Sequence, residues 1–380
     1  MRLLMLAEAR NVHTQRWASA LSANGSQVTV LSRSSAEIPG VQVIPLRVPR
    51  FGVTCPHRWW RRYSDFLARA VQRVDPNVIH VHYLQDHPMW WLQHPADAVT
   101  RPPLVISTWG SDVDTVGAQL VEPPDARKRK VDLLRAADAV TATTHYLARH
   151  TAAYAELDET EITVIPFGVD LTRFHPRPAS LGRSSRLTVG FVKHLERYYG
   201  ADYLVRAVPN VVARFPDVRF VIVGDGSMRD SLHRLADELG VTAYIDWPGA
   251  VPHDEIPGIL SEFDVLAMPS LSEAFGVSAV EAQAMGVPVV AFDVQGVDEA
   301  VQDGVGGILV SPAHHEKLAE AIGRLLGDAQ LRSTLGRRGR QFARAHFDFD
   351  ANVAAMEEVY DRARAVRASR MQSREAPCPA

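Results

Sequence analysis

The chain has 380 residues, of which 46% are hydrophobic and 22% charged, and its formal net charge is −3. This length exceeds one ordinary hydrophobic core and predicts two domains of roughly 180 residues each, while the balanced charge gives no reason to expect nucleic acid as a partner. The two cysteines, Cys55 and Cys378, are far apart, which excludes a disulfide framework and indicates a reducing, cytoplasmic compartment. We expect the short apolar run at the start to be a buried strand rather than a signal peptide, and we find no run of about 20 apolar residues that would predict a membrane span.

Short apolar runs alternate with helix-length periodic segments along the whole chain, a pattern typical of parallel sheets covered by helices. In the first half we expect strands at Leu3–Leu6, Val28–Leu31, Val41–Ile44, Val78–Val81, Leu104–Ser107, Ala139–Ala142 and Ile162–Ile165, with helices such as Trp17–Ala23 and Tyr63–Val74 between them. In the second half we expect strands at Thr188–Val192, Arg219–Val223, Ala243–Asp246, Val265–Met268, Val289–Phe292 and Ile308–Val310. The predicted fold class is α/β, with two doubly wound, Rossmann-like domains.

Two glutamates bracket a short apolar segment in EAFGVSAVE, from Glu273 to Glu281. A helix that opens near Phe275 or Gly276 presents free N–H groups to an anion, and Gly276 lets the backbone approach a phosphate closely. Eight residues of helix rise about 12 Å, whereas the carboxylates of a retaining glycosidase stand about 5 Å apart. An elongated ligand with an anionic middle, such as a nucleotide sugar, therefore fits better than a glycosidase substrate. The alternative is a pair of ordinary charges on an amphipathic helix.

Further segments match, in order, a known enzyme family. They are VIPFGVDLTRFHP at 164–176, VGDGSMRDSLHRLADELG at 223–240, and the stretch 263–310 that holds both glutamates. The chain resembles the retaining glycosyltransferases of the GT-B fold, family four in the usual sequence classification, whose signature is two glutamates separated by seven residues. The resemblance is strong after Ile162 and loose before it.

The resemblance implies two domains that face a central cleft. Residues 1–166 are expected to bind the acceptor, 167–186 to form a linker, and 187–348 to bind the nucleotide sugar. The last helix, 349–370, is expected to cross back to the first domain, and residues 371–380 are expected to be a loose end.

In the second half, the resemblance assigns roles toward the donor. Glu273 is expected to hold the sugar hydroxyls and Glu281 the ribose hydroxyls. Lys193, and as a second choice Arg197, would neutralise the diphosphate, because preorganised charge at a leaving group stabilises the transition state. Arg197 and Tyr198 stand where a variant subgroup of the family has proline and lysine, and solvated loop charges are the alternative for both cations.

Further donor contacts are expected from Phe275, Gly276, Gly224, Gly249 and Val251. The segment Gly224-Asp225-Gly226 follows a predicted strand and precedes a predicted helix, which would suit a phosphate loop. A motif this short is otherwise a tight turn.

The first half departs from the family pattern. Arg10-Asn11-Val12-His13-Thr14 replaces a glycine pair, and Trp109 stands where many relatives have a histidine before Gly-Ser-Asp. The expected acceptor-binding residues are His13, His82, Trp109 and Asp112, and Asp112 would orient either an acceptor hydroxyl or its own loop.

A cluster of candidate metal ligands lies nearby, at His80, His82, Asp86, His87 and His94. Zinc sites need three or four convergent ligands, and the resemblance implies that the donor diphosphate is stabilised without a metal. We therefore expect no metal and no cofactor other than the nucleotide sugar.

Arginines meet Trp59, Trp60 and Tyr63 in the segment 57–74. A helix of this kind can lie in an anionic membrane interface, which would place the protein on the inner face of the membrane and indicate a lipid-linked or envelope acceptor. A packed helix with solvated arginines is the alternative.

The function predicted from the resemblance is transfer of a sugar, with retention, from a nucleotide diphosphate sugar to an acceptor hydroxyl. Assembly of a cell-surface polysaccharide or glycolipid is the expected role. Glycosylation of a small secondary metabolite, another nucleotide-sugar enzyme of the same fold such as an epimerase or phosphorylase, and an inactive sugar-nucleotide-binding scaffold are the alternatives.

Overall fold

The computed structural model describes residues 1–46, 66–84, 101–114, 121–176 and 186–375, with side chains up to residue 372. The chain divides into two compact units. The first unit holds Met1–Ile165 together with Asp350–Ala380, and the second holds Pro166–Phe349. The division after Ile165 lies one residue from the expected end of the first domain.

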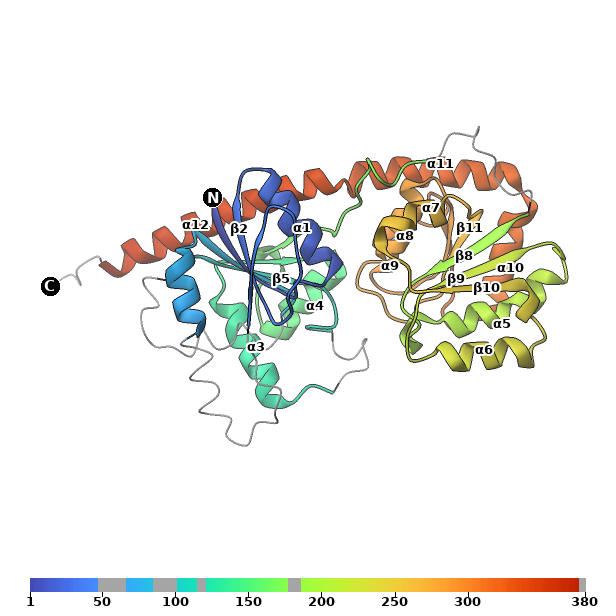
Figure 1. Ribbon diagram of the computed structural model, residues 1–380, viewed down its shortest axis with the longest axis horizontal. Coiled ribbons are helices and arrows are strands. Elements are labelled where there is room, and N and C mark those ends of the chain that lie inside the picture. Colours follow the sequence, from blue (N-terminus) through green and yellow to red (C-terminus); the bar gives the residue numbers. More distant parts are fainter. Residues whose placement is uncertain (47–65, 85–100, 115–120, 177–185, 376–380) are drawn as a thin grey trace. The chain divides into compact units, whose positions relative to one another are not determined.

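The first unit is built on a seven-stranded parallel sheet of order β3-β2-β1-β4-β5-β6-β7 (Figure 1). Its strands are β1 Arg2–Leu6, β2 Gln27–Ser32, β3 Gln42–Pro45, β4 Val78–His82, β5 Leu104–Thr108, β6 Ala139–Ala142 and β7 Ile162–Val164. Its helices are α1 Val12–Ala23, a helical segment at 66–74, α3 Pro124–Ala136, α4 His145–Ala155, η2 Glu159–Glu161 and α12 Phe349–Glu375. The strand order reverses between β1 and β4, and ligands of such sheets bind at this switch point, beyond the carboxyl ends of the strands.

The second unit repeats this plan with a six-stranded parallel sheet of order β10-β9-β8-β11-β12-β13. Its strands are β8 Thr188–Val192, β9 Arg219–Val223, β10 Ile245–Gly249, β11 Val265–Met268, β12 Val289–Phe292 and β13 Gly307–Val310. Its helices are η4 Arg197–Tyr199, α5 Ala201–Val212, α6 Arg229–Glu238, η5 Thr242–Tyr244, η6 His253–Glu255, α7 Ile256–Leu260, α8 Val277–Ala284, α9 Val297–Ala300, α10 His315–Gly327 and α11 Ala329–His346. Helix α5 packs with α6 and α10, whereas α8 packs with α9 and α11. The switch point of this sheet lies between β8 and β11.

The predicted fold class is confirmed, because both halves are parallel sheets with interleaved helices. Strand β10 begins two residues later than expected, because Thr242–Tyr244 forms the short helix η5 before it. Helix α1 begins earlier than expected, at Val12, because the side chain of Asn11 accepts hydrogen bonds from the backbone N–H groups of His13 and Thr14 and caps it.

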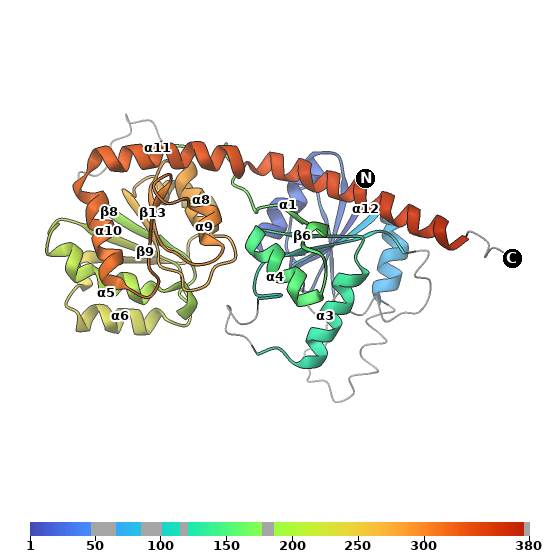
Figure 2. The same ribbon diagram turned by 180° about the vertical axis from the view of Figure 1, so that it is seen from behind.

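The expected last helix is present as α12 and packs on the first unit (Figure 2). It continues to Glu375, past the expected end at residue 370. The extension MQSRE contains no glycine or proline to stop a helix. Residues 376–380 lie outside the described part of the chain.

A buried chain of hydrogen bonds ties α12 to the first sheet. His80 on β4 contacts the Tyr360 hydroxyl of α12 through Nδ1 and the Ser107 hydroxyl of β5 through Nε2, both at 2.7 Å. Ser107 in turn contacts Thr141 of β6 at 2.7 Å. The ring of His82 lies beside His80, with its Nε2 3.0 Å from His80 Nδ1. Residues 280 positions apart in the sequence therefore share one buried polar contact. Hydrogen bonds offset the burial of His80, Ser107 and Tyr360, whereas Nδ1 of His82 is buried with no hydrogen-bond partner.

Burial determines the charge of both histidines. Desolvation, together with the neighbouring His82, lowers the pKa of His80 well below its ordinary value. Desolvation, together with nearby His13, lowers the pKa of His82 to about 3. Both rings are therefore neutral at pH 7.

Acidification is expected to destabilise the protein through His82. The pKa of His82 is about 3 in the folded protein and 6.5 in the unfolded chain, so on acidification the unfolded chain takes up the proton first. The free energy of unfolding therefore falls as the pH drops from 6.5 toward 3. Between about pH 6.5 and about pH 5 the free energy of unfolding should fall by about 2 kcal/mol because of this residue. Urea unfolding of the wild type and of His82→Leu at both pH values checks this.

The His82→Leu variant should lose that part of the pH dependence, whatever its stability at neutral pH. His315→Ala, which removes a partly exposed histidine of α10, should keep the wild-type dependence. An unchanged pH dependence in His82→Leu would contradict the prediction.

Candidate functional site

The switch point of the second sheet brings together two side chains that are 80 residues apart. Lys193 follows β8, Glu273 lies between β11 and α8, and Lys193 Nζ forms an ion pair with Glu273 Oε2. Their side chains are 13% and 10% exposed. The largely buried pair therefore lies at the edge of the sheet where doubly wound folds bind their ligands.

Neighbouring groups hold this pair in place. The ammonium group of Lys193 lies 4.5 Å from the centre of the Tyr199 ring, a cation–π distance. The Ser270 hydroxyl donates to Glu273 Oε2 at 3.4 Å. The loops after β8 and β11 are themselves joined, since the N–H of Leu271 donates to the carbonyl of Tyr198 at 2.8 Å. Arg197, the second predicted cation, lies in η4 with its residue exposed to solvent.

Helix α8 begins directly after this loop. Its N-cap is Gly276, whose φ of 93° lies in the left-handed region that favours glycine. Among the described residues, no side chain caps this helix. The first turn of α8 therefore combines the partial positive charge of a helix N-terminus with a backbone bare of capping side chains, a combination that suits an anion.

Glu281 lies further along α8, where a charge is unexpected. Every residue from Ser278 to Ala284 is buried, so α8 is not an amphipathic surface helix, and Glu281 is only 4% exposed. Its Oε1 lies 2.8 Å from Nε2 of His253. The interpretation of both glutamates as ordinary charges on a solvated face is therefore wrong.

Phe275 has a different position from the one expected of a donor contact. Its side chain is 1% exposed and packs edge-to-face against Phe167 at 5.9 Å and Phe347 at 5.3 Å between ring centroids. This corrects the expectation for its side chain, which anchors the start of α8 in the core of the second unit. The sequence alone does not distinguish a buried aromatic from a binding one in a loop of this length.

Two glycines, Gly224 after β9 and Gly249 at the end of β10, bring neighbouring loops close together. A Cβ atom on Gly224 would lie 1.9 Å from the carbonyl oxygen of Lys193, so only glycine fits there. The N–H of Gly224 donates to the carbonyl of Gly249 at 2.9 Å. Val251, two residues further on, is half-buried.

The turn that leads from Gly224 into α6 is already occupied by a carboxylate. Glu196 accepts from the Ser227 N–H at 3.0 Å and from the Ser227 hydroxyl, and these bonds lower the pKa of Glu196. The N–H of Gly226 donates to Asp225. The geometry therefore favours the tight-turn interpretation of Gly224-Asp225-Gly226 over a phosphate loop.

The switch point of the first sheet gathers three of the residues expected to bind the acceptor. The ring of Trp109 lies edge-to-face with His13 at 5.8 Å and with His82 at 5.2 Å. Two residues that the sequence did not single out join them. The ring centroid of Trp17 lies 6.2 Å from that of His82, and the ring centroid of Tyr83 lies 6.2 Å from that of Trp109. The cluster is aromatic and, because burial keeps His82 neutral, its buried histidine carries no charge.

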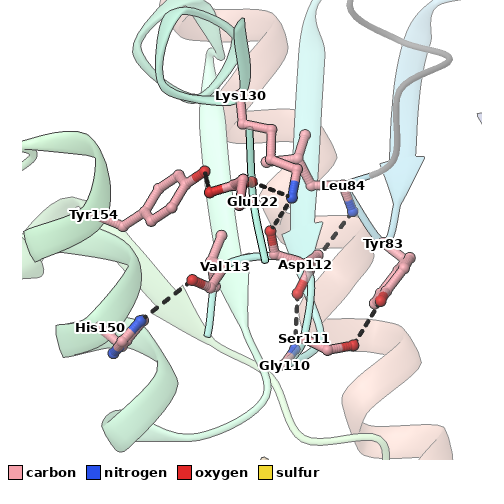
Figure 3. A network of polar contacts seen from close by, with 10 residues as sticks. All are labelled: Tyr83, Leu84, Gly110, Ser111, Asp112, Val113, Glu122, Lys130, His150 and Tyr154. Atoms are coloured by element: carbon pink, nitrogen blue, oxygen red, sulfur yellow. Dashed lines mark hydrogen bonds and ion pairs between the residues drawn. The ribbon is translucent and has the colours of Figure 1, made fainter. Parts of the chain in front are cut away.

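Asp112 lies next to this cluster but is directed into its own loop (Figure 3). Its carboxylate accepts from the N–H groups of Leu84 at 3.0 Å, Trp109 at 3.1 Å and Gly110 at 2.8 Å. Burial raises the pKa of Asp112, and these three backbone bonds oppose that rise. Of the two expected roles, the geometry favours ordering of the loop over orientation of an acceptor hydroxyl.

A second layer of contacts fixes the loop that Asp112 orders (Figure 3). Lys130 of α3 donates to the backbone carbonyl of Asp112 at 2.6 Å and pairs with Glu122 at 2.8 Å. The Tyr154 hydroxyl also donates to Glu122, and burial and this carboxylate raise the pKa of Tyr154. The loop that carries Trp109 is therefore held from β4, α3 and α4.

The remaining predictions fall partly outside the described chain. Asp86, His87 and His94 lie outside it, as do Trp59, Trp60 and Tyr63. Within the described ranges there is no group of three or more histidine, cysteine or acidic residues that could hold a metal ion. The helical segment 66–74 packs Leu67 and Ala70 into the core of the first unit. None of the described helices has the length and apolar character that crossing a bilayer requires.

Comparison with known proteins identifies the family. Residues 11–173 match the model of Glycosyltransferase Family 4, and residues 177–342 match that of Glycosyl transferases group 1. The D-inositol 3-phosphate glycosyltransferase of Nocardia farcinica is 31% identical over 94% of this chain and 85% of its own length. The enzyme of the same name from Mycobacterium bovis is 31% identical over 89% of this chain and 74% of its own length.

Solved structures show the fold. Sucrose-phosphate synthase from Thermosynechococcus elongatus superimposes with a TM-score of 0.79 at 21% identity, over 95% of this chain and 98% of that one. The Anabaena protein HepE, solved in complex with UDP and glucose, gives a TM-score of 0.76 at 21% identity, over 95% and 99%. The chain therefore belongs to the group 1 glycosyltransferases of family four, which have the GT-B fold.

Proposed function

We propose that this chain is a retaining glycosyltransferase that moves a hexosyl group from a nucleotide diphosphate sugar to an acceptor hydroxyl. The observation that carries the proposal is the Lys193–Glu273 pair beside the uncapped start of α8. A cation, a helix N-terminus and a carboxylate meet there, and these are the groups that a diphosphate joined to a sugar requires.

The donor would lie along α8. The diphosphate binds at the first turn, where the helix dipole and Lys193 both favour negative charge. Glu273 accepts hydrogen bonds from the sugar hydroxyls, and Glu281, further along the helix, accepts from the ribose. The solved complexes of HepE with UDP and with UDP-glucose support a nucleotide-sugar donor for a chain of this fold.

In the proposed reaction the acceptor attacks from the face that the diphosphate leaves. A bond forms between the acceptor oxygen and the anomeric carbon, the bond from that carbon to the phosphate oxygen breaks, and the acceptor proton passes to the departing oxygen. Lys193 stabilises the charge that grows on the diphosphate. Because Lys193 and α8 supply the positive charge, the proposal requires neither a metal ion nor a protein nucleophile.

The acceptor would bind at the aromatic cluster of the first unit, formed by His13, His82 and Trp109. Planar rings suit the apolar faces of a sugar or cyclitol, and the neutral ring of His82 suits its hydroxyls. Assembly of a surface polysaccharide or glycolipid, with the protein on the inner face of the membrane, is one proposed role. The solved WaaG, described as involved in lipopolysaccharide biosynthesis, supports it at 16% identity.

A small acceptor is the second candidate, and the more similar relatives favour it. Several relatives at 31% identity are named D-inositol 3-phosphate glycosyltransferases, which supports a small hydroxylated acceptor for this chain as well. The inactive-scaffold alternative requires loss of the reacting groups, whereas Lys193, Glu273 and Glu281 are all present.

Glu273→Gln is expected to lower transfer by about 100-fold or more, because it removes a charge that fixes both the donor sugar and Lys193. A screen of nucleotide sugars for slow hydrolysis identifies the donor, and steady-state transfer rates are then compared. Thermal unfolding shows whether the variant folds. Glu320→Gln, on the exposed face of α10, is the matched control and should keep the wild-type rate. A wild-type rate in Glu273→Gln would show that this carboxylate has no role in the reaction.

Retention has its own test. Proton NMR of the reaction with an α-linked donor should show the product first as the α-anomer, since attack occurs on the face that the leaving group vacates. A β-linked first product would contradict the proposed mechanism and leave the family assignment intact.

A further inference from the structure

We propose that His253 is a positioning residue that orients the Glu281 carboxylate toward the ribose of the donor. This inference rests on the proposed function, in which Glu281 is the ribose contact. His253 lies 28 residues before Glu281, on the short helix η6 that follows β10. It is outside the segment that carries the two glutamates.

Burial makes a partner for Glu281 necessary. A carboxylate that is 4% exposed has lost most of its water, and an ionised group in such a place is costly without a hydrogen bond. His253 Nε2 lies 2.8 Å from Oε1 and supplies that bond. Because an ionised carboxylate only accepts, the His253 ring must carry its proton on Nε2 in this contact.

His253 is itself held on a second side. Its ring packs against Phe174 at 5.6 Å between centroids, and Phe174 is buried in the second unit. The adjoining residues are joined as well, since Arg173 pairs with Asp254 at 2.7 Å. The segment before β8 and the loop after β10 therefore fix the ring, and the ring fixes one oxygen of Glu281.

The second oxygen is the one that can meet a ligand. Among the described residues, Glu281 Oε2 has no hydrogen-bond partner, whereas Oε1 is engaged by His253. A ribose offers two neighbouring hydroxyl donors, and a carboxylate whose rotation is fixed presents Oε2 to them in one direction. Without His253, the carboxylate would turn among several positions, and the ribose contact would weaken.

Discrimination for the ribose hydroxyls is therefore the property to measure. Isothermal titration calorimetry with UDP and with GDP shows which nucleotide binds. A second titration with the 2′,3′-dideoxy form of that nucleotide then gives the ratio of the affinity for the ribose form to the affinity for the dideoxy form. In the wild type we expect the ribose form to bind about 10-fold more tightly or better. In His253→Ala this ratio should approach one, with most of the loss in affinity falling on the ribose form. His253→Gln, whose amide can still donate to Oε1, should recover a large part of the ratio.

His315→Ala is the matched control, because it breaks another His–Glu contact of the second unit, with Glu316 at 3.4 Å, on the surface of α10. It should keep the wild-type ratio. A purely structural role for His253 would lower the thermal midpoint and leave the ratio unchanged, and that result would overturn the inference. Should His253→Ala fail to fold, His253→Asn, whose amide is too short to replace Nε2, serves as the variant that lacks the contact, and His253→Gln remains the variant that keeps it.

The two proposals fail in different ways. If the wild type binds a nucleotide and distinguishes its ribose, but His253→Ala does so equally well, the role of His253 is wrong and the proposed function stands. If the wild type binds the ribose and dideoxy forms alike, Glu281 is not the ribose contact, and both the donor arrangement and this inference fall.

Discussion

The candidate donor site of the second unit is built around one ion pair, between Lys193 and Glu273, at the point where the sheet reverses its order. Two largely buried charges are costly to desolvate, and their attraction offsets that cost only in a close geometry. The pair joins the loops after β8 and β11, and so it keeps both groups at the carboxyl edge of the sheet. A diphosphate that arrives there offers Lys193 a second anion to contact. In the proposed donor arrangement, Glu273 then accepts hydrogen bonds from the sugar hydroxyls, and the resting contact is replaced by contacts to the donor.

The same architecture carries opposite chemistry in the two units. The switch point of the second sheet is charged, whereas that of the first sheet is formed by Trp109, His13 and a His82 that burial keeps neutral. Asp112 lies three residues after Trp109, but its carboxylate oxygens accept hydrogen bonds from backbone N–H groups. A charged ligand such as a nucleotide therefore suits the second unit, and an acceptor recognised through hydroxyls and ring faces suits the first. The proposed division into a donor-binding and an acceptor-binding unit rests on this difference in charge and burial between two units of the same plan.

The sequence predicted the strands well because most of them are buried, continuous apolar runs, and β6, β8, β9, β11 and β12 have the expected bounds. It predicted a role for Lys193 only through family resemblance, and no local pattern indicates that Lys193 and Glu273 meet across 80 residues. Phe275 and Gly224 show the limit more sharply. Both stand in loops beside the site, and whether such a residue faces a ligand or another loop depends on neighbours such as Phe347 that are distant in the sequence. The sequence did not indicate a role for His253 for the same reason, since its partner Glu281 is on another element.

Helix α8 explains why so few residues are enough to define the proposed donor site. A helix that is buried all round is held by packing on every side, so its first turn and its one buried carboxylate have fixed positions. Phe275 anchors the start of α8 in the core, Gly276 turns the chain into the helix, and His253 holds the carboxylate at its far part. None of these residues needs to contact the reacting atoms. In the proposed donor arrangement, they set the distance and direction between the anion site and the hydroxyl site, and this spacing would distinguish a nucleotide sugar from a free phosphate or a free sugar.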